Sequence, residues 1–297
     1  MKLTIVLVNY KCDKIKLQSC LDSIKINTEV LIIDHSHDFT FENILKPKDL
    51  NIKVIKNKNL GNGAGINCGI NNSNTRYVLY LDIDTILSPF FFNTLEESIK
   101  KIDNFAVIAP KINNFYKDEH IKKRGNLSYF SFNYNKIFYK IALEEKNSDN
   151  LKQVFFVSGS IMLFDKKNTF EKNIKFDENI FMFYEENDFF HQCFKKNEKI
   201  YLINNLIADH SDGSVNDKSL KYECYKKWHW EWSKYYFLNK HYNKLFTSLI
   251  AIKSILKLSI KIIFYYMINK KKYYLNKCRL IGLISFYLKK KCKINYY

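Results

Sequence analysis

The stretch Tyr77-Val78-Leu79-Tyr80-Leu81-Asp82-Ile83-Asp84-Thr85 is an apolar run that passes directly into two aspartates. Five consecutive apolar residues predict a short buried strand, so both aspartates fall at its carboxyl end. A D-x-D at this point has two interpretations: it caps a following helix, or its carboxylates hold a divalent cation. The segments on either side decide between them.

Short β-rich runs recur before and after this stretch, separated by helical or loop segments. They lie at residues 3–8, 30–33, 52–55 and 105–109. An amphipathic helix is expected over residues 15–26, and another should begin with Ser88 as N-cap and Pro89 at its first position. This alternation predicts an α/β fold with a parallel, doubly wound sheet. In such sheets ligands bind at the carboxyl ends of the strands.

Polar clusters follow the first three predicted strands. Asn9-Tyr10 ends the first, Asp34-His35-Ser36-His37-Asp38 ends the second, and a glycine-rich segment, residues 59–67, follows the third. The glycine-rich segment could be only a turn. Its G-x-G-x-G spacing is neither the dinucleotide-binding fingerprint nor a P-loop, so NAD binding is disfavoured.

Taken together, the clusters converge on one edge of the sheet and favour a nucleotide site. Asp82 and Asp84 offer the hard oxygen ligands that Mg²⁺ or Mn²⁺ prefers, and such an ion would neutralise a diphosphate. Asp34 could accept a hydrogen bond from the N3–H of uracil or thymine. Glycines near Asn59 let the backbone approach a ligand closely. The pattern therefore predicts a site for a pyrimidine nucleoside diphosphate.

In order along residues 3–215, these segments resemble the family 2 glycosyltransferases, especially the bacterial rhamnosyltransferase-like branch. The matching segments are Val8-Asn9-Tyr10, residues 33–38, 59–69 and 77–85, Val157-Ser158-Gly159-Ser160-Ile161-Met162-Leu163, Phe176-Asp177-Glu178, residues 181–188, and Ala208-Asp209-His210-Ser211-Asp212-Gly213-Ser214. Three departures stand out: the family's E-D is Glu185-Glu186, Gly63 is additional, and the usual Arg is replaced around residues 193–195.

The resemblance implies a GT-A nucleotide-diphospho-sugar transferase fold, with a mostly parallel central sheet flanked by helices, and inversion at the anomeric carbon. It also implies a divalent cation, Mn²⁺ or Mg²⁺, held by Asp84, Asp82 and His210. A lone histidine such as His210 can equally be a structural residue. The residues expected to bind the nucleotide-sugar are Asn9, Tyr10, Asp34, Ser36, Asn59, Gly61, Gly65 and Asp82.

An inverting transfer needs a carboxylate that takes the proton of the acceptor hydroxyl. Glu185, Glu186 and Asp188 lie within four residues, where we expect a helix to begin. Glu186 falls at the position of the family's catalytic Asp, so it is the best candidate for the base. Glu185 and Asp188 are expected to hold the acceptor or the start of the helix. The alternative is that all three acids only stabilise the helix N-terminus.

Charge divides the chain of 297 residues, whose formal net charge is +18. Residues 217–297 hold 19 of the 48 basic residues and three acids, a net charge of +16, which leaves +2 for residues 1–216. We therefore expect a GT-A catalytic domain over 1–216 and a basic, aromatic, helical C-terminal region over 217–297. Only three basic residues are Arg, the residue that reads bases, so nucleic acid is not an expected partner. An AT-biased genome could also produce this Lys-rich composition.

The C-terminal region predicts contact with a membrane surface. Lys253, Lys257 and Lys261 recur every four residues in an apolar segment, residues 245–268, so they share one helix face. A cationic, aromatic-rich amphipathic helix suits the plane of an anionic membrane. The alternative is a solvated Lys face on a helix packed against the catalytic body. The aromatic cluster at residues 228–232 could stack on a sugar, or pack in the core or at a membrane interface.

The sequence thus predicts a metal-dependent, inverting hexosyltransferase, cytoplasmic and peripheral on the inner face of a bacterial plasma membrane. It would move a hexose or deoxyhexose from a UDP- or dTDP-sugar to a hydroxyl of a lipid-linked saccharide, in the biosynthesis of lipopolysaccharide, lipooligosaccharide, capsule or O-antigen. Two alternatives stay open: a sugar-phosphate nucleotidyltransferase and a basic nucleic-acid-binding protein. The seven cysteines show no C-x-x-C pair, which favours reduced thiols. The sequence contains no run of 18 uncharged apolar residues, so a membrane-spanning helix is not expected.

Overall fold

The computed structural model describes residues 1–36, 40, 44–113, 150–211 and 219–292. The chain divides into two units. The sheet unit comprises Met1–Asn59, Gly65–Lys175 and Phe189–Val215, and the helical unit comprises Leu60–Ala64, Phe176–Asp188 and Asn216–Tyr297. The predicted domains are 1–216 and 217–297. The observed division differs from them mainly in assigning two short internal segments, Leu60–Ala64 and Phe176–Asp188, to the helical unit. Each unit is described by itself.

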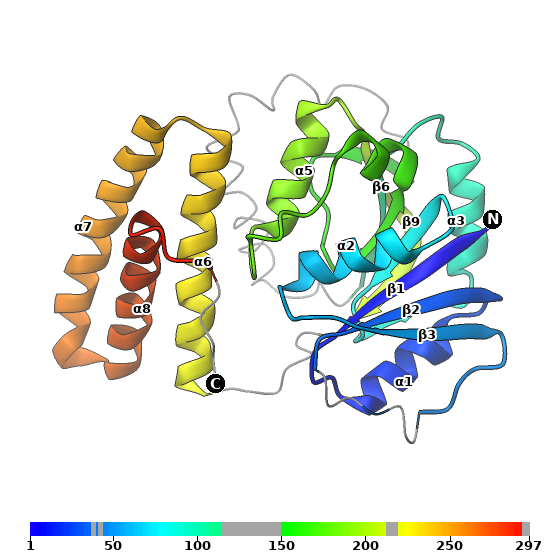
Figure 1. Ribbon diagram of the computed structural model, residues 1–297, viewed down its shortest axis with the longest axis horizontal. Coiled ribbons are helices and arrows are strands. Elements are labelled where there is room, and N and C mark those ends of the chain that lie inside the picture. The colour runs from blue at the N-terminus through cyan, green and yellow to red at the C-terminus, as the bar shows by residue number, and fades with distance from the viewer. Residues whose placement is uncertain (37–39, 41–43, 114–149, 212–218, 293–297) are drawn as a thin grey trace. The chain divides into compact units, whose positions relative to one another are not determined.

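A nine-stranded mixed sheet forms the sheet unit, in the order β3-β2-β1-β4-β8-β6-β9-β5, with β7 paired to β9 (Figure 1). The parallel side consists of β1 (Leu3–Asn9), β2 (Thr28–Asp34), β3 (Leu50–Lys56) and β4 (Tyr77–Leu81). The other side consists of β5 (Thr85–Leu87), β6 (Val107–Ile112), β7 (Leu151–Val154), β8 (Ile161–Asp165) and β9 (Ile200–His210). β8 runs antiparallel to both of its neighbours, β4 and β6. The five runs of the sequence that predict strands are all strands, and the predicted α/β class is confirmed.

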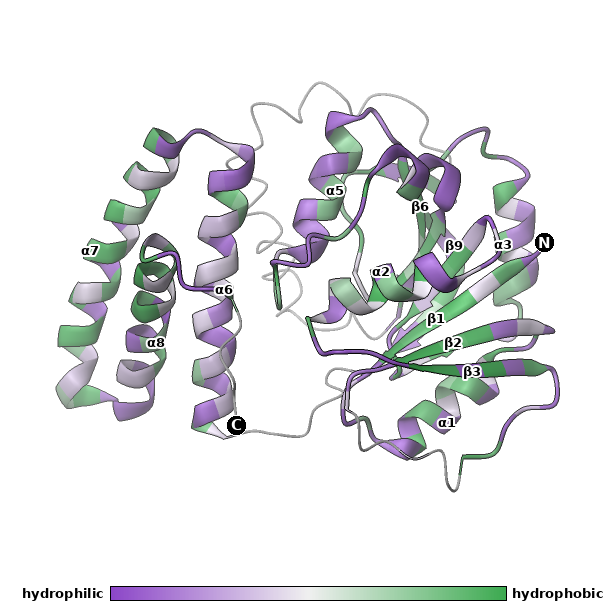
Figure 2. Ribbon diagram, in the orientation of Figure 1, coloured by the Kyte–Doolittle hydropathy of each residue, from purple (hydrophilic) through white to green (hydrophobic). Residues whose placement is uncertain are grey.

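Helices cover the sheet according to the two-residue period of its strands. Leu3, Ile5 and Leu7 of β1 belong to the core that includes α1 (Lys14–Ser23) and α3 (Phe91–Ile99). Val6 and Val8 point to the opposite face, against α2 (Asn62–Asn72). The strands β1, β2 and β4 are hydrophobic and buried along most of their length, as expected when both faces of a sheet are covered (Figure 2). The edge strand β3 is largely exposed.

Two glycines allow α2 to approach β1 closely. A Cβ atom at Gly65 would lie 2.7 Å from Cγ1 of Val8, and one at Gly69 would lie 2.3 Å from Cγ1 of Val6. Both distances are too short for two carbon atoms, so the packing of α2 on β1 requires glycine, which has no side chain, at both positions. The expected contact of Gly65 with a nucleotide stays a prediction.

The predicted start of the helix after β5 is wrong by two residues. α3 begins at Phe91 with Phe90 in the N-cap position and no side-chain capping bond. Ser88 instead continues the strand pairing, because its N–H donates to the carbonyl of Ile207 in β9 at 3.3 Å. The turn at Pro89 therefore separates the sheet from the helix rather than opening the helix.

Three helices make up most of the helical unit: α6 (Leu220–His241), α7 (Lys244–Ile268) and α8 (Lys270–Tyr287). Ser219, Asn243 and Asn269 cap their N-termini through side-chain oxygens. Tyr235, Phe237, Ile250, Ala251 and Leu283 are among the residues that form the core between them. Among the described residues, no helix is both long and apolar enough to cross a membrane.

The helix α5 (Glu185–Lys195) crosses the boundary between the units. Its first turn, with the three acids, belongs to the helical unit, and the rest belongs to the sheet unit.

Candidate active site

The first polar cluster lies at the carboxyl ends of β1 and β2. These strands are parallel and in register, so Asn9 stands directly opposite Asp34. The Asn9 amide donates to Oδ1 of Asp34 at 2.8 Å and to Oγ of Ser36 at 3.3 Å. Ser36 donates to the same Oδ1 through its backbone N–H at 3.0 Å and through its hydroxyl. Three of the predicted donor-binding residues therefore form one buried network.

The second oxygen of Asp34 is the chemically open part of this network. Oδ2 is buried and has no hydrogen-bond partner in the part of the chain that the structure describes. A buried carboxylate oxygen without a partner is costly, so such an atom is a natural acceptor for a ligand N–H.

The second polar cluster consists of Asp82, Asp84 and His210 and belongs to the same unit. Asp82 and Asp84 lie between β4 and β5, and His210 ends β9. The antiparallel pairing of β5 with β9 sets Thr85 opposite His210, which brings the histidine to the aspartates. Nε2 of His210 is 3.1 Å from Oδ1 of Asp84 and 3.3 Å from Oδ2 of Asp82.

The two carboxylates create a strong field for cations at this point. Burial alone would lower the pKa of His210, but hydrogen bonds to Asp82 and Asp84 and their charges outweigh it and raise the pKa to about 10. Tyr80 and Thr85 hold Asp82 in place: the tyrosine hydroxyl donates to its side chain and the threonine hydroxyl to its backbone carbonyl. The cluster is therefore built to stabilise a positive charge.

These residues fit a divalent cation. One ligand atom from each of the three lies within 4.8 Å of the others. Oδ2 of Asp84 is buried and lacks a hydrogen-bond partner among the described residues. Two carboxylates and one imidazole are a donor set that suits Mn²⁺ or Mg²⁺.

The acids at the start of α5 form a third cluster, in the helical unit. Asp188 is fully buried, Glu185 is buried, and Glu186 is half-buried. Oδ1 of Asp188 is 2.6 Å from Nε2 of His241 and 2.8 Å from Nζ of Lys240. Two residues at the end of α6 therefore hold the Asp188 carboxylate.

The same lysine ties in a further acid. Nζ of Lys240 is 2.7 Å from Oδ2 of Asp177, which also accepts from the Tyr236 hydroxyl at 2.9 Å. Burial alone would raise the pKa of Asp177, but the hydrogen bonds from Lys240 and Asn179 hold it below its usual value. The sequence singled out neither Lys240 nor His241, because a Lys-His pair at a helix end has no distinctive local pattern.

The backbone just before these acids is in an unusual conformation. Phe183 and Tyr184 have φ angles of 63° and 67°, in the left-handed region that side chains disfavour. Edge-to-face contacts of both rings with Trp230 hold them there. Strained backbone of this kind concentrates at functional sites.

The remaining predicted site residues lie outside the three clusters described above. Tyr10 is half-buried and lies beneath Nζ of Lys11 at 5.8 Å, and Asn59 is half-buried in a loop. Gly61 has a φ of 102° and packs against the backbone of Phe181 within the helical unit. The motif residues His37, Asp38, Asp212, Gly213 and Ser214 lie outside the described residues.

Packing in the core accounts for Trp228 and Trp232 of the aromatic cluster. Each is only 5% exposed. Their rings stack at 6.4 Å, so the sugar-stacking alternative does not apply to these two residues.

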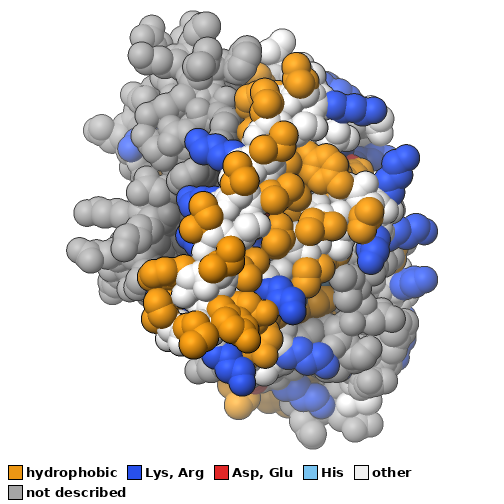
Figure 3. Space-filling view, turned by 90° about the vertical axis from the view of Figure 1, so that its left-hand side faces the viewer, with side chains coloured by type: hydrophobic (Ala, Val, Ile, Leu, Met, Phe, Trp, Pro, Cys, Tyr) orange, Lys and Arg blue, Asp and Glu red, His pale blue; other side chains and the backbone are white. Residues whose placement is uncertain are grey.

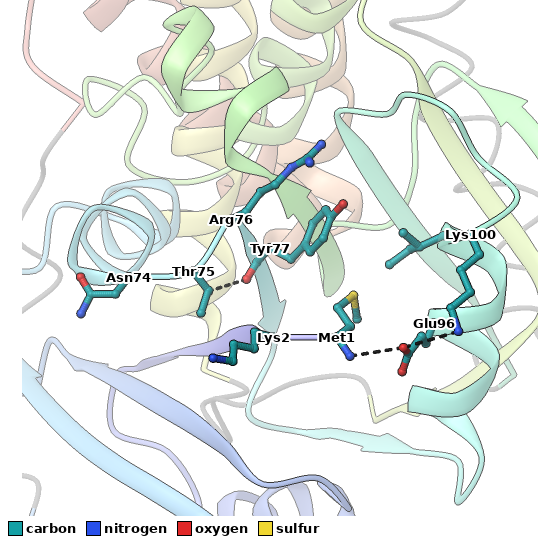
Figure 4. Close-up of a pocket in the computed structure, with 9 residues that line it drawn as sticks. Met1, Lys2, Asn74, Thr75, Arg76, Tyr77, Glu96 and Lys100 are labelled. Carbon is teal, nitrogen blue, oxygen red and sulfur yellow. Dashed lines mark hydrogen bonds and ion pairs between the residues drawn. The ribbon is translucent and has the colours of Figure 1, made fainter.

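A cavity of about 480 Å³ lies elsewhere on the sheet unit (Figure 4). Its lining includes Met1 and Lys2, which precede β1, and residues 74–77, which lead into β4 and include its first residue, so the cavity lies at the amino ends of these strands. Glu96 bridges the N-terminal amine and Lys100 at its side. The first two polar clusters, by contrast, lie at the carboxyl ends of strands, where ligands of parallel sheets bind.

A sheet of this topology, with an Asp-x-Asp cluster at the end of a parallel strand, is the GT-A fold of nucleotide-sugar transferases. The chain belongs to glycosyl transferase family 2, whose family model matches residues 4–169. It is similar to the uncharacterized glycosyltransferase MJ1057 of Methanocaldococcus jannaschii, with 25% identity over 264 residues, covering 82% of this chain and 84% of the relative. The family assignment favours glycosyl transfer over the nucleotidyltransferase and nucleic-acid-binding alternatives.

Solved structures of S. aureus TarS share the fold. One TarS chain gives a TM-score of 0.52 at 14% identity, covering 96% of this chain and 55% of TarS, so the chain spans about half of that protein. TarS 1-349 in complex with UDP-GlcNAc gives a TM-score of 0.51 at 15% identity, covering 98% of this chain and 93% of the TarS chain.

Proposed function

We propose that the protein transfers a hexose or deoxyhexose, with inversion, from a UDP- or dTDP-sugar to a hydroxyl of a lipid-linked saccharide. The observation that carries the proposal is the grouping of Asp82, Asp84 and His210 at the carboxyl end of β4 in a family 2 fold. The solved TarS structure with UDP-GlcNAc supports a nucleotide-sugar donor for this fold.

Each cluster has a role in the proposed reaction. Asp34 accepts a hydrogen bond from N3–H of the pyrimidine through its open oxygen, and Asn9 and Ser36 hold that carboxylate in place. Asp82, Asp84 and His210 would hold a divalent cation, which would supply positive charge for the leaving diphosphate.

Glu186 is the proposed general base. The acceptor hydroxyl attacks the anomeric carbon, the bond to the diphosphate breaks, and Glu186 takes the hydroxyl proton. Its half-buried side chain supports this choice, since a base must be reachable by the acceptor. Asp188 is held by Lys240 and His241, which supports a role in fixing the start of α5.

The proposed setting is the inner face of a bacterial plasma membrane, in surface-glycan assembly. The basic helical unit supports this setting, because no acid follows Glu231 in the sequence. A lipid-linked acceptor is presented at such a surface.

A donor screen tests the proposal. UDP-, dTDP- and GDP-sugars are added with Mn²⁺, and the melting temperature is followed. A pyrimidine nucleotide-sugar should raise it only with the metal present, because a bound ligand stabilises the fold by mass action. The positive donor should then be hydrolysed slowly with release of its nucleoside diphosphate. Stabilisation by GDP-sugars alone, or full activity in chelator, would refute the assigned donor or the assigned metal.

A further inference from the structure

Helix α7 carries a continuous row of exposed apolar side chains, here called the α7 ridge. Their exposed fractions range from 56% to 85%, and the members are Leu245, Leu249, Ile252, Leu256, Ile260, Ile263 and Met267. The spacing of four, three and four residues repeats every 11 residues, which keeps the row straight along an α-helix. Figure 3 looks onto this side of the helical unit and shows apolar side chains over its centre with Lys and Arg around the edge.

The opposite side of α7 is already used. Thr247, Ile250, Ala251 and Leu258 are buried and face the other helices of the unit. The ridge is therefore not a core face that the fold has left incomplete. Soluble proteins rarely expose contiguous apolar patches of this extent unless another surface covers them.

The charges beside the ridge decide what that surface is. Lys253 and Lys257 each follow a ridge residue by one position and are exposed on its flank. No acid occurs in α7 or α8, and the two acids of α6, Glu223 and Glu231, are ion-paired with Lys271 and Arg279. Two copies joined through their ridges would bring these lysines together with no carboxylate between them. An anionic surface complements them.

We propose that the α7 ridge is the membrane-docking face: it lies in the interface of an anionic lipid bilayer, with α7 parallel to the membrane and Lys253 and Lys257 on headgroups. An apolar row with lysines on its flank and a packed opposite side is suited to lying in the interface plane. The proposal rests on the proposed function for its purpose, since a lipid-linked acceptor would be delivered at this surface.

Flotation of the full chain with vesicles tests the proposal. The vesicles are phosphatidylcholine with phosphatidylglycerol in a two-to-one ratio, and phosphatidylcholine alone serves for comparison. The ridge variant combines Leu249→Gln, Leu256→Gln and Ile263→Gln. The matched control combines Ile15→Gln, Leu45→Gln and Phe90→Gln, which are exposed apolar residues of the sheet unit.

The wild-type chain and the control should partition onto anionic vesicles, and the ridge variant should lose on the order of a hundredfold in partition. Replacing Lys253 and Lys257 with Gln should cost about thirtyfold, because each lysine contributes about 1 kcal/mol near anionic lipid. Equal partition of ridge variant and wild type overturns the proposal. The proposal is also overturned if light scattering shows that the wild type is a dimer, the ridge variant is a monomer, and the ridge variant still partitions onto vesicles. The ridge would then be covered by a second copy of the chain.

Donor-induced thermal stabilisation is measured on the same variants. If it persists in all of them while flotation does not depend on the ridge, the docking surface fails and the proposed function stands. If flotation depends on the ridge but no nucleotide-sugar stabilises the wild type, the proposed function fails and the surface stands.

Discussion

At the residue scale, the cluster of Asp82, Asp84 and His210 shows how a few contacts concentrate charge. The sequence brings the two aspartates within three positions, but the histidine arrives from a strand far along the chain. The pKa of His210 is raised because the hydrogen bonds and charges of the two aspartates favour its protonated form. A cation with more charge than a proton gains more from the same field.

Asp84→Asn should weaken the attraction of this cluster for a divalent cation. The variant removes the charge of a buried carboxylate while keeping its shape, so the proposed metal site would lose a ligand. Donor hydrolysis should fall by about a thousandfold, and the Mn²⁺-dependent rise in melting temperature should disappear. Asp103→Asn, at an exposed position on the same unit, is the control and should leave both unchanged. Retention of the Mn²⁺ response in Asp84→Asn would remove this residue from the metal site.

The acids of α5 allow a second test at this scale. Glu186→Gln should reduce sugar transfer by several orders of magnitude, while donor stabilisation in the thermal assay survives, because only the proton acceptor is lost. Glu185→Gln is the matched comparison, one position away. The assignment is wrong by one residue if Glu185→Gln stops transfer and Glu186→Gln does not.

At the scale of elements, α5 and α6 are joined through one buried carboxylate. Asp188 accepts from both Lys240 and His241, and Lys240 also reaches Asp177. These contacts bridge more than 50 positions of sequence, so they leave no local pattern. The first turn of α5 depends on them for its position.

Asp188→Asn should therefore destabilise the helical unit by about 3 kcal/mol, because removing one partner of a buried ion pair leaves the others uncompensated. Urea unfolding followed by tryptophan fluorescence measures this, since Trp228, Trp230 and Trp232 all lie on α6. Glu97→Gln replaces an exposed acid of α3 and should change stability by less than about 0.5 kcal/mol. An unfolding midpoint in Asp188→Asn equal to that of the wild type would mean that the network contributes nothing to stability.

The elements also show which parts of the fold a sequence reveals. The five apolar runs that predict strands are local signals, and all five correspond to strands, β1, β2, β3, β4 and β6. β5 has only three residues and exists through its pairing with β9, so nothing local predicts it. For the same reason the sequence predicts that the helix starts at Ser88. The hydrogen bond from Ser88 to Ile207 of β9 is a tertiary contact that the sequence does not show. For the site, residue types at strand ends were enough to group Asn9, Asp34 and Ser36, whereas the partners of Asp188 required the tertiary structure.

At the scale of the whole molecule, charge and chemistry are separated along the chain. Residues 217–297 carry +16 of the net charge of +18, while residues 1–216, which hold the polar clusters at the ends of β1, β2 and β4, carry only +2. Under the proposed function, the net charge therefore bears on where the reaction takes place more than on its chemistry. All three tryptophans lie in the helical unit, so its stability can be followed separately from that of the sheet unit.

Acid should destabilise the helical unit through His229. This side chain is fully buried beside Trp228 and Phe181, with Nδ1 3.3 Å from Sγ of Cys292, and burial lowers its pKa to about 3. A histidine in the unfolded chain titrates near pH 6.5. Between about pH 6.5 and 3, His229 is therefore protonated in the unfolded state and neutral in the folded state. Stability contributed by neutral His229 is therefore complete above about pH 6.5 and is lost as the pH falls, by about 3 kcal/mol at about pH 4.5. Urea midpoints from tryptophan fluorescence should decline over this range in the wild type and much less in His229→Phe, which cannot take up the proton. An equally steep decline in His229→Phe would assign the acid sensitivity to other groups.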